Sequence, residues 1–249
     1  MATALITGAS SGMGKDMALI LANKGYDLIL VARNGEKLTE LANQINTQVT
    51  VIPMDLSIRK NCFKLHSIAR NIDILINNAG FGAWGEFYYS NLKNELNMID
   101  LNISAIHILT KLYLRDFVRR NKGYILNVAS LASFGSGPLM ATYYATKAYV
   151  YKLTTAINEE LRQRRSRVHI SVFCPGPVDT EFNNRANVTF SIKPLSSQEA
   201  AKKALNGMFW KKTVIFPSFS NWLTMLACKF APLRLVLMAC FHIQKSKVN

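Results

Sequence analysis

Residues 7–14 read Thr7-Gly8-Ala9-Ser10-Ser11-Gly12-Met13-Gly14, and they join the first apolar run of the chain to a helical stretch expected from Lys15 onward. Glycine lets the backbone turn sharply and approach a diphosphate, whose charge then lies at the N-terminus of the next helix. The glycines follow the spacing G-x-x-x-G-x-G. A tight turn is the alternative, but a first strand-to-helix junction favours a phosphate-binding loop. We therefore expect nucleotide contacts from Gly8, Ser10, Ser11, Gly12, Met13 and Gly14.

Apolar runs rich in Val, Ile and Leu recur between stretches of helical period. They cover residues 4–7, 26–32, 49–54, 72–76, 124–128, 168–173 and 213–216. Short continuous apolar runs that alternate with helices are typical of a parallel sheet covered on both faces. The pattern predicts an α/β fold, a Rossmann-type doubly wound parallel sheet of about seven strands.

The length and composition predict one domain over residues 1–249. Of these residues 49% are hydrophobic, which is enough for one well-buried α/β core. No charged leader with an apolar run precedes the first strand, so we expect a cytoplasmic protein. Four cysteines (Cys62, Cys174, Cys228 and Cys240) lie far apart without metal-ligand spacing. We expect reduced thiols and no metal.

The chain is strongly basic, with a formal net charge of +15. Such a charge suits nucleic acid, an anionic membrane surface or anionic ligands. A nucleic-acid binder predicts aromatic residues interleaved with a basic stripe, or a known module, and the sequence has neither. We therefore expect no nucleic-acid partner. The cluster Arg162, Arg164, Arg165 and Arg167 is interpreted as a solvated helix end, since cations suit helix C-termini.

The end of the second strand indicates which nucleotide is bound. A carboxylate there would accept hydrogen bonds from a ribose 2′-hydroxyl. Arg33 follows Ala32 instead, and the next acidic residue is Glu36. A cation favours a 2′-phosphate, so we expect NADP(H) in preference to NAD(H); plain surface exposure of Arg33 is the alternative.

Further candidate residues follow the third, fourth and sixth strands. Asp55, with Leu56, is placed to accept from an adenine amino group or to cap the next helix. The small residues of Asn78-Ala79-Gly80 would let backbone lie against a cofactor, or form a plain turn. Ligands of open α/β sheets bind at strand C-termini. The cofactor residues expected after the sixth strand are Pro175, Gly176, Val178 and Thr180.

Tyr143 and Lys147 lie four residues apart, with Ser130 thirteen residues before the tyrosine. On a helix, residues i and i+4 share a face. Lowering a tyrosine pKa from about 10 to near neutrality requires about 4 kcal/mol. An ammonium about 4.5 Å away supplies about 3 to 4 kcal/mol at an effective dielectric constant of about 20. The pair is therefore interpreted as an acid/base device.

Together these motifs resemble the short-chain dehydrogenase/reductase family over nearly the whole chain. In that family the glycine loop, N-N-A-G, the serine, Y-x-x-x-K and P-G recur in this order. The resemblance implies that Tyr143 exchanges a proton with a small carbonyl or alcohol substrate, that Lys147 lowers its pKa and holds the nicotinamide ribose, and that Ser130 binds the substrate oxygen. It also implies that Asn102 holds a water linked to Lys147, although a polar residue bending a helix is the alternative.

The resemblance further implies a substrate lid at about residues 178–200 and a homodimer or homotetramer formed through residues 92–117 and 143–161. Tyr144 and Tyr149 lack the combined serine and lysine spacing, so we interpret them as packing or surface aromatics. A nucleotide-binding regulator without turnover is the alternative function. The retention of Ser130, Tyr143 and Lys147 together argues against it.

The C-terminal segment, about residues 218–249, is apolar and basic. Lys229, Pro232 and Arg234 interrupt its apolar run, so we expect that the segment does not span a membrane. Peripheral contact with anionic lipid is one interpretation. Cover for the substrate pocket or a subunit contact is the other.

Overall fold

The central element is a seven-stranded parallel sheet. The structure is a computed structural model that describes residues 2–181 and 194–245. The strand order is β3-β2-β1-β4-β5-β6-β9, and all paired strands are parallel. This confirms the doubly wound α/β prediction. The strands are β1 (Thr3–Thr7), β2 (Asp27–Ala32), β3 (Val49–Pro53), β4 (Ile74–Asn77), β5 (Tyr124–Val128), β6 (His169–Phe173) and β9 (Val214–Ile215).

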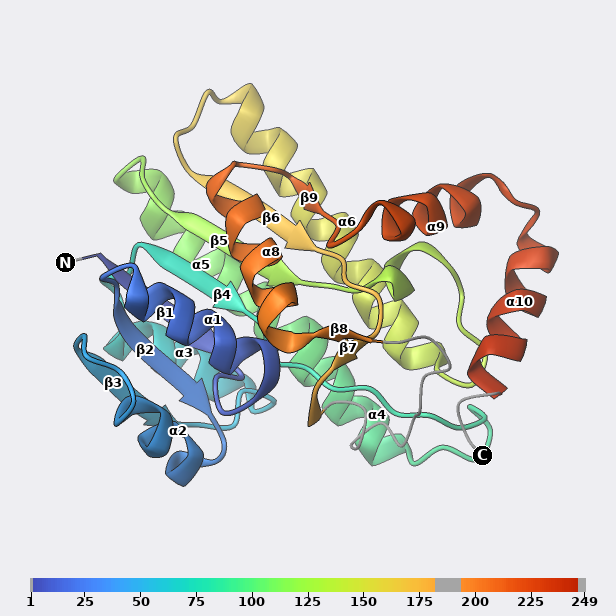
Figure 1. Ribbon diagram of the computed structural model, residues 1–249, viewed down its shortest axis with the longest axis horizontal. Coiled ribbons are helices and arrows are strands. Elements are labelled where there is room, and N and C mark those ends of the chain that lie inside the picture. The colour runs from blue at the N-terminus through green and yellow to red at the C-terminus, as the bar shows by residue number, and fades with distance from the viewer. Residues whose placement is uncertain (1, 182–193, 246–249) are drawn as a thin grey trace.

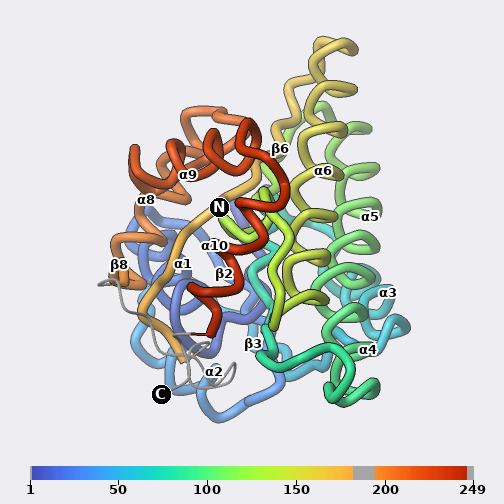
Figure 2. The backbone as a smooth tube through the Cα atoms, turned by 90° about the vertical axis from the view of Figure 1, so that its right-hand side faces the viewer, coloured from blue at the N-terminus to red at the C-terminus, as the bar shows by residue number. Residues whose placement is uncertain are grey.

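Helices cover both faces of the sheet (Figures 1 and 2). One layer holds α1 (Gly12–Asn23), α2 (Gly35–Ala42) and α8 (Ser197–Phe209). The other holds α3 (Arg59–Ile68), α5 (Ile106–Arg119) and α6 (Ala141–Gln163). Here α4 (Leu92–Ile99) runs through a π-helical turn, η1 (Asp100–Ala105), into α5.

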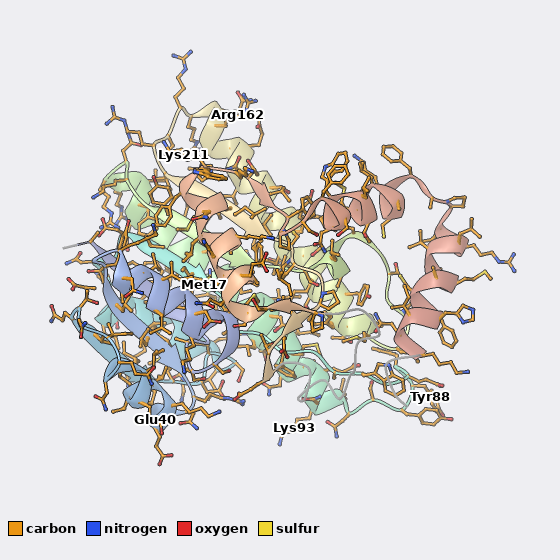
Figure 3. The ribbon with its side chains drawn as sticks, viewed as in Figure 1. Met17, Glu40, Tyr88, Lys93, Arg162 and Lys211 are labelled. Atoms are coloured by element: carbon orange, nitrogen blue, oxygen red, sulfur yellow. The ribbon has the colours of Figure 1, made fainter. Side chains whose placement is uncertain are left out.

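Two apolar cores lie between these layers and the sheet, because successive strand residues point to opposite faces. On β1, Ala4 and Ile6 join the core under α1, α2 and α8, whereas Leu5 joins the core under α3 and α5. Met17 of α1 lies inside, while charged side chains point outward (Figure 3).

The strand order reverses between β1 and β4, since β2 and β3 lie on one side of β1 and β4 to β6 lie on the other. The crevice at such a reversal is where open α/β sheets bind ligands. The loops after β1 and β4 are residues 8–11 and 78–80, so both predicted small-residue segments meet there.

Several elements have no counterpart in the sequence-based prediction. A small parallel sheet pairs β7 (Val178–Asp179) with β8 (Leu195–Ser196), and a 3-10 turn, η2 (Leu131–Phe134), follows Ser130. Of the expected lid, residues 182–193 lie outside the described residues.

The C-terminal extension is helical, with α9 (Phe219–Phe230) and α10 (Leu233–Lys245) separated at Pro232. The two helices stand at one end of the molecule, shown in red in Figure 1. Among the described residues, no helix combines the length and the apolar character needed to cross a membrane.

Candidate active site

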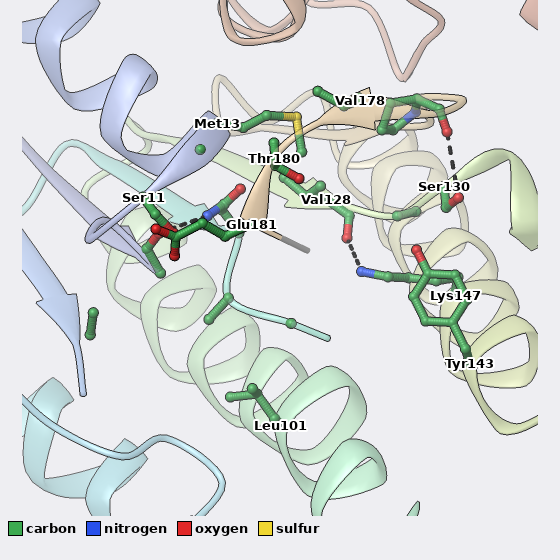
Figure 4. A pocket seen from close by; sticks show the side chains of 18 of the residues that line it. Ser11, Met13, Leu101, Val128, Ser130, Tyr143, Lys147, Val178, Thr180 and Glu181 are labelled. Carbon is green, nitrogen blue, oxygen red and sulfur yellow. Dashed lines mark hydrogen bonds between the residues drawn. The ribbon is translucent and has the colours of Figure 1, made fainter. Parts of the chain in front are cut away.

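A cavity of about 480 Å³ runs along the C-terminal edge of the sheet. It extends from the glycine loop and the end of β2 to Ser130 and Tyr143 on the other side of β4 (Figure 4). Of the predicted site residues, only Gly14 and Asn102 do not line it. The predicted residues that do are Gly8, Ser10, Ser11, Gly12, Met13, Arg33, Asp55, Leu56, Asn78, Ala79, Gly80, Ser130, Tyr143, Lys147, Pro175, Gly176, Val178 and Thr180.

The glycine loop is held against the loop after β4. Asn78 Nδ2 donates to the carbonyl oxygens of Thr7 (3.0 Å) and Gly8 (3.2 Å), and Thr7 Oγ1 accepts from the backbone N–H groups of Asn78 and Ala79. Gly8 has φ of +66°, and a Cβ there would lie 2.9 Å from Ala79 Cα. Helix α1 begins at Gly12 rather than at the predicted Lys15, so its first turn belongs to the loop. The backbone is thus open toward the cavity as a phosphate-binding loop requires.

The side chains at the ends of β2 and β3 line the other end of the cavity. Arg33 is exposed there. Lys37, in the first turn of α2, also lines the cavity, and its Nζ pairs with Glu181 Oε1 at 2.8 Å. Asp55 Oδ1 accepts from the N–H (2.9 Å) and the hydroxyl (2.7 Å) of Ser57. This carboxylate therefore closes a local turn, and it does not cap α3, which begins four residues later at Arg59.

Tyr143 and Lys147 occupy the first two turns of α6, as the spacing predicted. Lys147 Nζ lies 5.8 Å from the centroid of the Tyr143 ring and donates to the Val128 carbonyl oxygen at 2.9 Å. Ser130 precedes η2, and its Oγ accepts from the Ala132 N–H at 3.1 Å. The side chains of Ser130, Tyr143 and Lys147 converge at one end of the cavity (Figure 4).

The expected pKa of the phenol is wrong for this arrangement. Burial raises the pKa of Tyr143 to about 12, although its hydrogen bond with Ser130 lowers it. Burial also lowers the pKa of Lys147 to about 8. Removing both groups from water disfavours their charged forms, so burial is the main cause of both pKa shifts. At neutral pH, Tyr143 therefore carries its proton.

Asn102 lies within the π-helical turn and is fully buried. Its Oδ1 accepts from the Phe81 N–H at 3.1 Å, and its Nδ2 donates to the Phe81 carbonyl oxygen at 2.9 Å and to Thr146 Oγ1 at 3.2 Å. Thr146 in turn donates to the Tyr143 carbonyl oxygen at 2.7 Å. Asn102 thus connects the loop after β4 to the helix of the tyrosine.

Comparison with known proteins identifies the family. A family model described as short chain dehydrogenase matches residues 2–189. The chain belongs to the short-chain dehydrogenase family. An uncharacterised oxidoreductase of Staphylococcus aureus (strain USA300) is 31% identical over 216 residues, which are 85% of this chain and 92% of that protein. The protein is therefore an oxidoreductase of this family.

Solved short-chain dehydrogenases share the fold. A short-chain dehydrogenase from Sphingobium yanoikuyae in complex with NADPH matches with a TM-score of 0.83 and 29% identity, covering 92% of this chain and 94% of that chain. The bulky-bulky ketone specific alcohol dehydrogenase from Comamonas testosteroni matches with a TM-score of 0.80 and 30% identity, covering 92% of each chain.

Some residues of this short-chain dehydrogenase site were missed from the sequence. Lys37 lies four residues after Arg33, in the first turn of α2, and this second basic residue was visible in the sequence. Tyr144, interpreted as a packing or surface aromatic, lines the cavity, as does Gln244 of α10. No local pattern points to Gln244, because its place depends on how the C-terminal helix packs. In the part of the chain that the structure describes, no cluster of three or more potential metal ligands occurs.

Proposed function

We propose that this chain is an NADP(H)-dependent oxidoreductase that interconverts a carbonyl and a hydroxyl group, with Tyr143 as general acid and base. The observation that carries the proposal is the convergence of Ser130, Tyr143 and Lys147 on a cavity that begins at a glycine loop. A regulator that only binds nucleotide would not require a buried phenol and a buried ammonium at the end of the cavity opposite the glycine loop.

The proposed occupant of the cavity is a nicotinamide dinucleotide that extends from the glycine loop to Tyr143. Gly8 and Gly12 let the loop pack closely against its neighbours, because a Cβ at these positions would lie 2.9 Å from Ala79 Cα or Thr180 Cγ2. The backbone of this loop would then bind the diphosphate. The residues proposed to hold the nucleotide are the cavity-lining members of the glycine loop, Arg33, Leu56, Ala79, Gly80 and Val178. NADPH, when bound, supplies the hydride for the carbonyl carbon.

The chain's own residues handle the proton. Tyr143 is protonated at neutral pH because burial raises its pKa to about 12, so it enters the reduction as an acid. It gives that proton to the carbonyl oxygen, while the Ser130 hydroxyl donates a hydrogen bond that stabilises the developing alkoxide. Lys147 holds the nicotinamide ribose, and a water at Asn102 links its ammonium to solvent for reprotonation.

NADP(H) is proposed over NAD(H) from the charges at the end of β2. Arg33 and Lys37 both line the cavity there, and Glu36 does not, whereas Glu181 lines the cavity and pairs with Lys37 at 2.8 Å. The Arg33 cation suits a 2′-phosphate, whereas a carboxylate at the end of β2 would bind a ribose 2′-hydroxyl. The complex of the Sphingobium relative with NADPH supports this choice.

The substrate is proposed to be an apolar or lipid-like ketone or aldehyde. The substrate end of the cavity is lined by the apolar side chains of Leu131, Ala132 and Met140. The similarity to an alcohol dehydrogenase specific for bulky ketones supports this class.

Replacement of the phenol tests the mechanism. Tyr143→Phe should retain NADPH binding, measured by the fluorescence of the bound nucleotide, and should lose at least 100-fold in kcat for ketone reduction, since general acid catalysis contributes about 10² to 10⁴. Tyr149→Phe is the matched control on the same helix, because its hydroxyl contacts His107 Nδ1 at 2.7 Å and not the cavity. Full turnover by Tyr143→Phe would contradict the assignment.

Helices α9 and α10 are proposed to make peripheral contact with anionic lipid. Their exposed apolar side chains include Phe219, Phe230 and Leu233, each at least 65% exposed, and Lys229 and Arg234 are near them in sequence. Apolar side chains beside cations suit a headgroup interface. The triple variant with serine at the three apolar positions should lose binding to phosphatidylglycerol vesicles. Phe63→Ser, which removes an exposed phenylalanine of α3, is the control; equal binding by both would exclude this contact.

A homodimer or homotetramer is proposed through the outer faces of α4, α5 and α6. Leu92 and Leu96 on α4 are 67% and 51% exposed, which leaves apolar surface for a second copy. Light scattering of the purified protein checks this, since a monomer at micromolar concentration would contradict it.

A further inference from the structure

Two polar side chains face the cavity beyond the proposed catalytic tyrosine. Gln244 lies in the last turn of α10, and Tyr144 lies in the first turn of α6, next to Tyr143. Gln244 Nε2 donates to Tyr144 Oη at 2.5 Å. Both residues line the same cavity as Tyr143, whose ring centroid lies 6.2 Å from that of Tyr144. The pair is therefore close to the place where a substrate would meet the proton donor.

One atom of this pair is buried without a partner. Gln244 is 1% exposed, and its Oε1 has no hydrogen-bond partner among residues 2–181 and 194–245. The O–H proton of Tyr144 is also unused by the bond from Gln244, in which the tyrosine oxygen accepts. Buried polar atoms are nearly always paired, so an orphan acceptor in a cavity wall indicates a ligand group that completes it.

The position of Gln244 is held by contacts other than its own amide. Trp84 Nε1 donates to the backbone oxygen of Gln244 at 3.0 Å. Earlier in α10, Val236 is buried, and a Cβ at Gly135 would contact its Cγ1 at 3.5 Å. The absence of a Cβ at Gly137 likewise makes room for the Tyr144 ring, which such an atom would overlap. Contacts outside the side-chain amide therefore also hold this part of α10 in place.

We propose that Tyr144 and Gln244 bind a hydroxyl group of the substrate, at a site separate from the reacting carbonyl. A hydroxyl both donates and accepts, so it can donate to Gln244 Oε1 and accept from the Tyr144 O–H. If the amide is turned by 180°, its donor and acceptor exchange, and a hydroxyl still satisfies both groups. In the amide orientation that the structure shows, a carbonyl or an ether oxygen, which only accepts, would leave Oε1 unpaired.

The substrate class that follows is an apolar ketone that carries one hydroxyl group, because the same cavity is also lined by the apolar residues Leu131, Ala132 and Met140. This inference rests on the proposed carbonyl reduction. A site built to hydrogen-bond a hydroxyl discriminates strongly against the analogue that lacks it, since its buried polar groups are then left unpaired.

The test uses the full chain with cyclic ketones, each compared with the same ketone bearing a hydroxyl at one of several ring positions. The variant Gln244→Leu removes the amide, and Tyr144→Phe removes the hydroxyl. Gln198→Leu, at an exposed glutamine of α8, is the matched control. Two quantities are measured: kcat/KM with NADPH, and ketone affinity for the protein with NADP⁺ bound, where no reduction occurs.

The wild type should prefer the hydroxylated member of at least one pair by tenfold or more. Gln244→Leu should reduce that preference by about 10- to 100-fold, the loss expected when a buried hydrogen bond is removed. A preference that persists in Gln244→Leu and Tyr144→Phe, or no preferential binding of any hydroxylated ketone by the wild type, would overturn the inference. Gln244-dependent binding without any reduction would support the polar pair and refute the proposed reaction instead.

Discussion

Substitution of Gly14 tests whether the loop that opens the fold also binds the cofactor. A Cβ on Gly14 would overlap the carbonyl oxygen of Gly8 and would lie 2.6 Å from Asn78 Nδ2 and 2.8 Å from the Gly8 carbonyl carbon. Ordinary contact begins near 3.4 Å, so the Gly8 peptide and Asn78 must recede by about 1 Å. Both neighbours belong to the bonded junction between the loops after β1 and β4.

Gly14→Ala should weaken NADPH binding about 10- to 100-fold, because overpacking costs about 1 to 3 kcal/mol and the displaced peptide lines the cavity. The assay is fluorescence titration with NADPH, together with urea unfolding. Gly25→Ala is the matched control. Gly25 has φ of +82° but no heavy atom within 4 Å of its added Cβ, so it should lose stability through backbone strain and keep its NADPH affinity. NADPH affinity of Gly14→Ala within twofold of the wild type would refute the loop as the nucleotide site.

Three further outcomes are expected. Arg33→Ala should raise the Kd for NADPH about 10- to 100-fold and change that for NADH less than threefold, by titration of both nucleotides; equal losses would exclude a 2′-phosphate contact. Lys147→Met should have a higher free energy of unfolding than the wild type, and this difference should be largest below pH 8. Burial lowers the pKa of Lys147 from 10.5 to about 8, so the unfolded chain binds more protons than the folded one between these values, and wild-type stability rises there. Urea unfolding should show the difference shrinking by about 3 kcal/mol as pH rises from 8 to 10.5, and a pH-independent difference would contradict the burial of a charged lysine. Asn102→Ala should lower the free energy of unfolding by about 2 to 4 kcal/mol, because Phe81 and Thr146 lose their buried partners; a loss under 0.5 kcal/mol would show that Asn102 does not hold these segments.

The parts of the site that could be predicted from the sequence depend on short-range geometry. The i, i+4 spacing of Tyr143 and Lys147 and the glycines after the first strand act within one or two turns of backbone. The seven apolar runs could be predicted because a buried parallel strand is apolar on both faces. The strands β7 (Val178–Asp179) and β8 (Leu195–Ser196) were missed because each pairs one apolar with one polar residue and forms no continuous apolar run.

The remaining features depend on packing between distant segments. Gln244 and Tyr144 are 100 residues apart, and only the position of α10 brings them together. The predicted low pKa of Tyr143 was wrong because charge proximity was estimated without the desolvation that burial imposes on both partners. Spacing shows which groups are neighbours along a helix, but not how much water reaches them.

The transfer of deuterium from NADPH labelled at the nicotinamide C4 tests the proposed reaction most directly. The protein is incubated with the labelled cofactor and an apolar hydroxyketone, and the product is analysed by mass spectrometry. The proposal predicts one deuterium at the new carbinol carbon in the wild type, and at least 100-fold slower formation of that alcohol in Tyr143→Phe. Oxidation of NADPH without a labelled alcohol, or equal rates of its formation in both proteins, would contradict it.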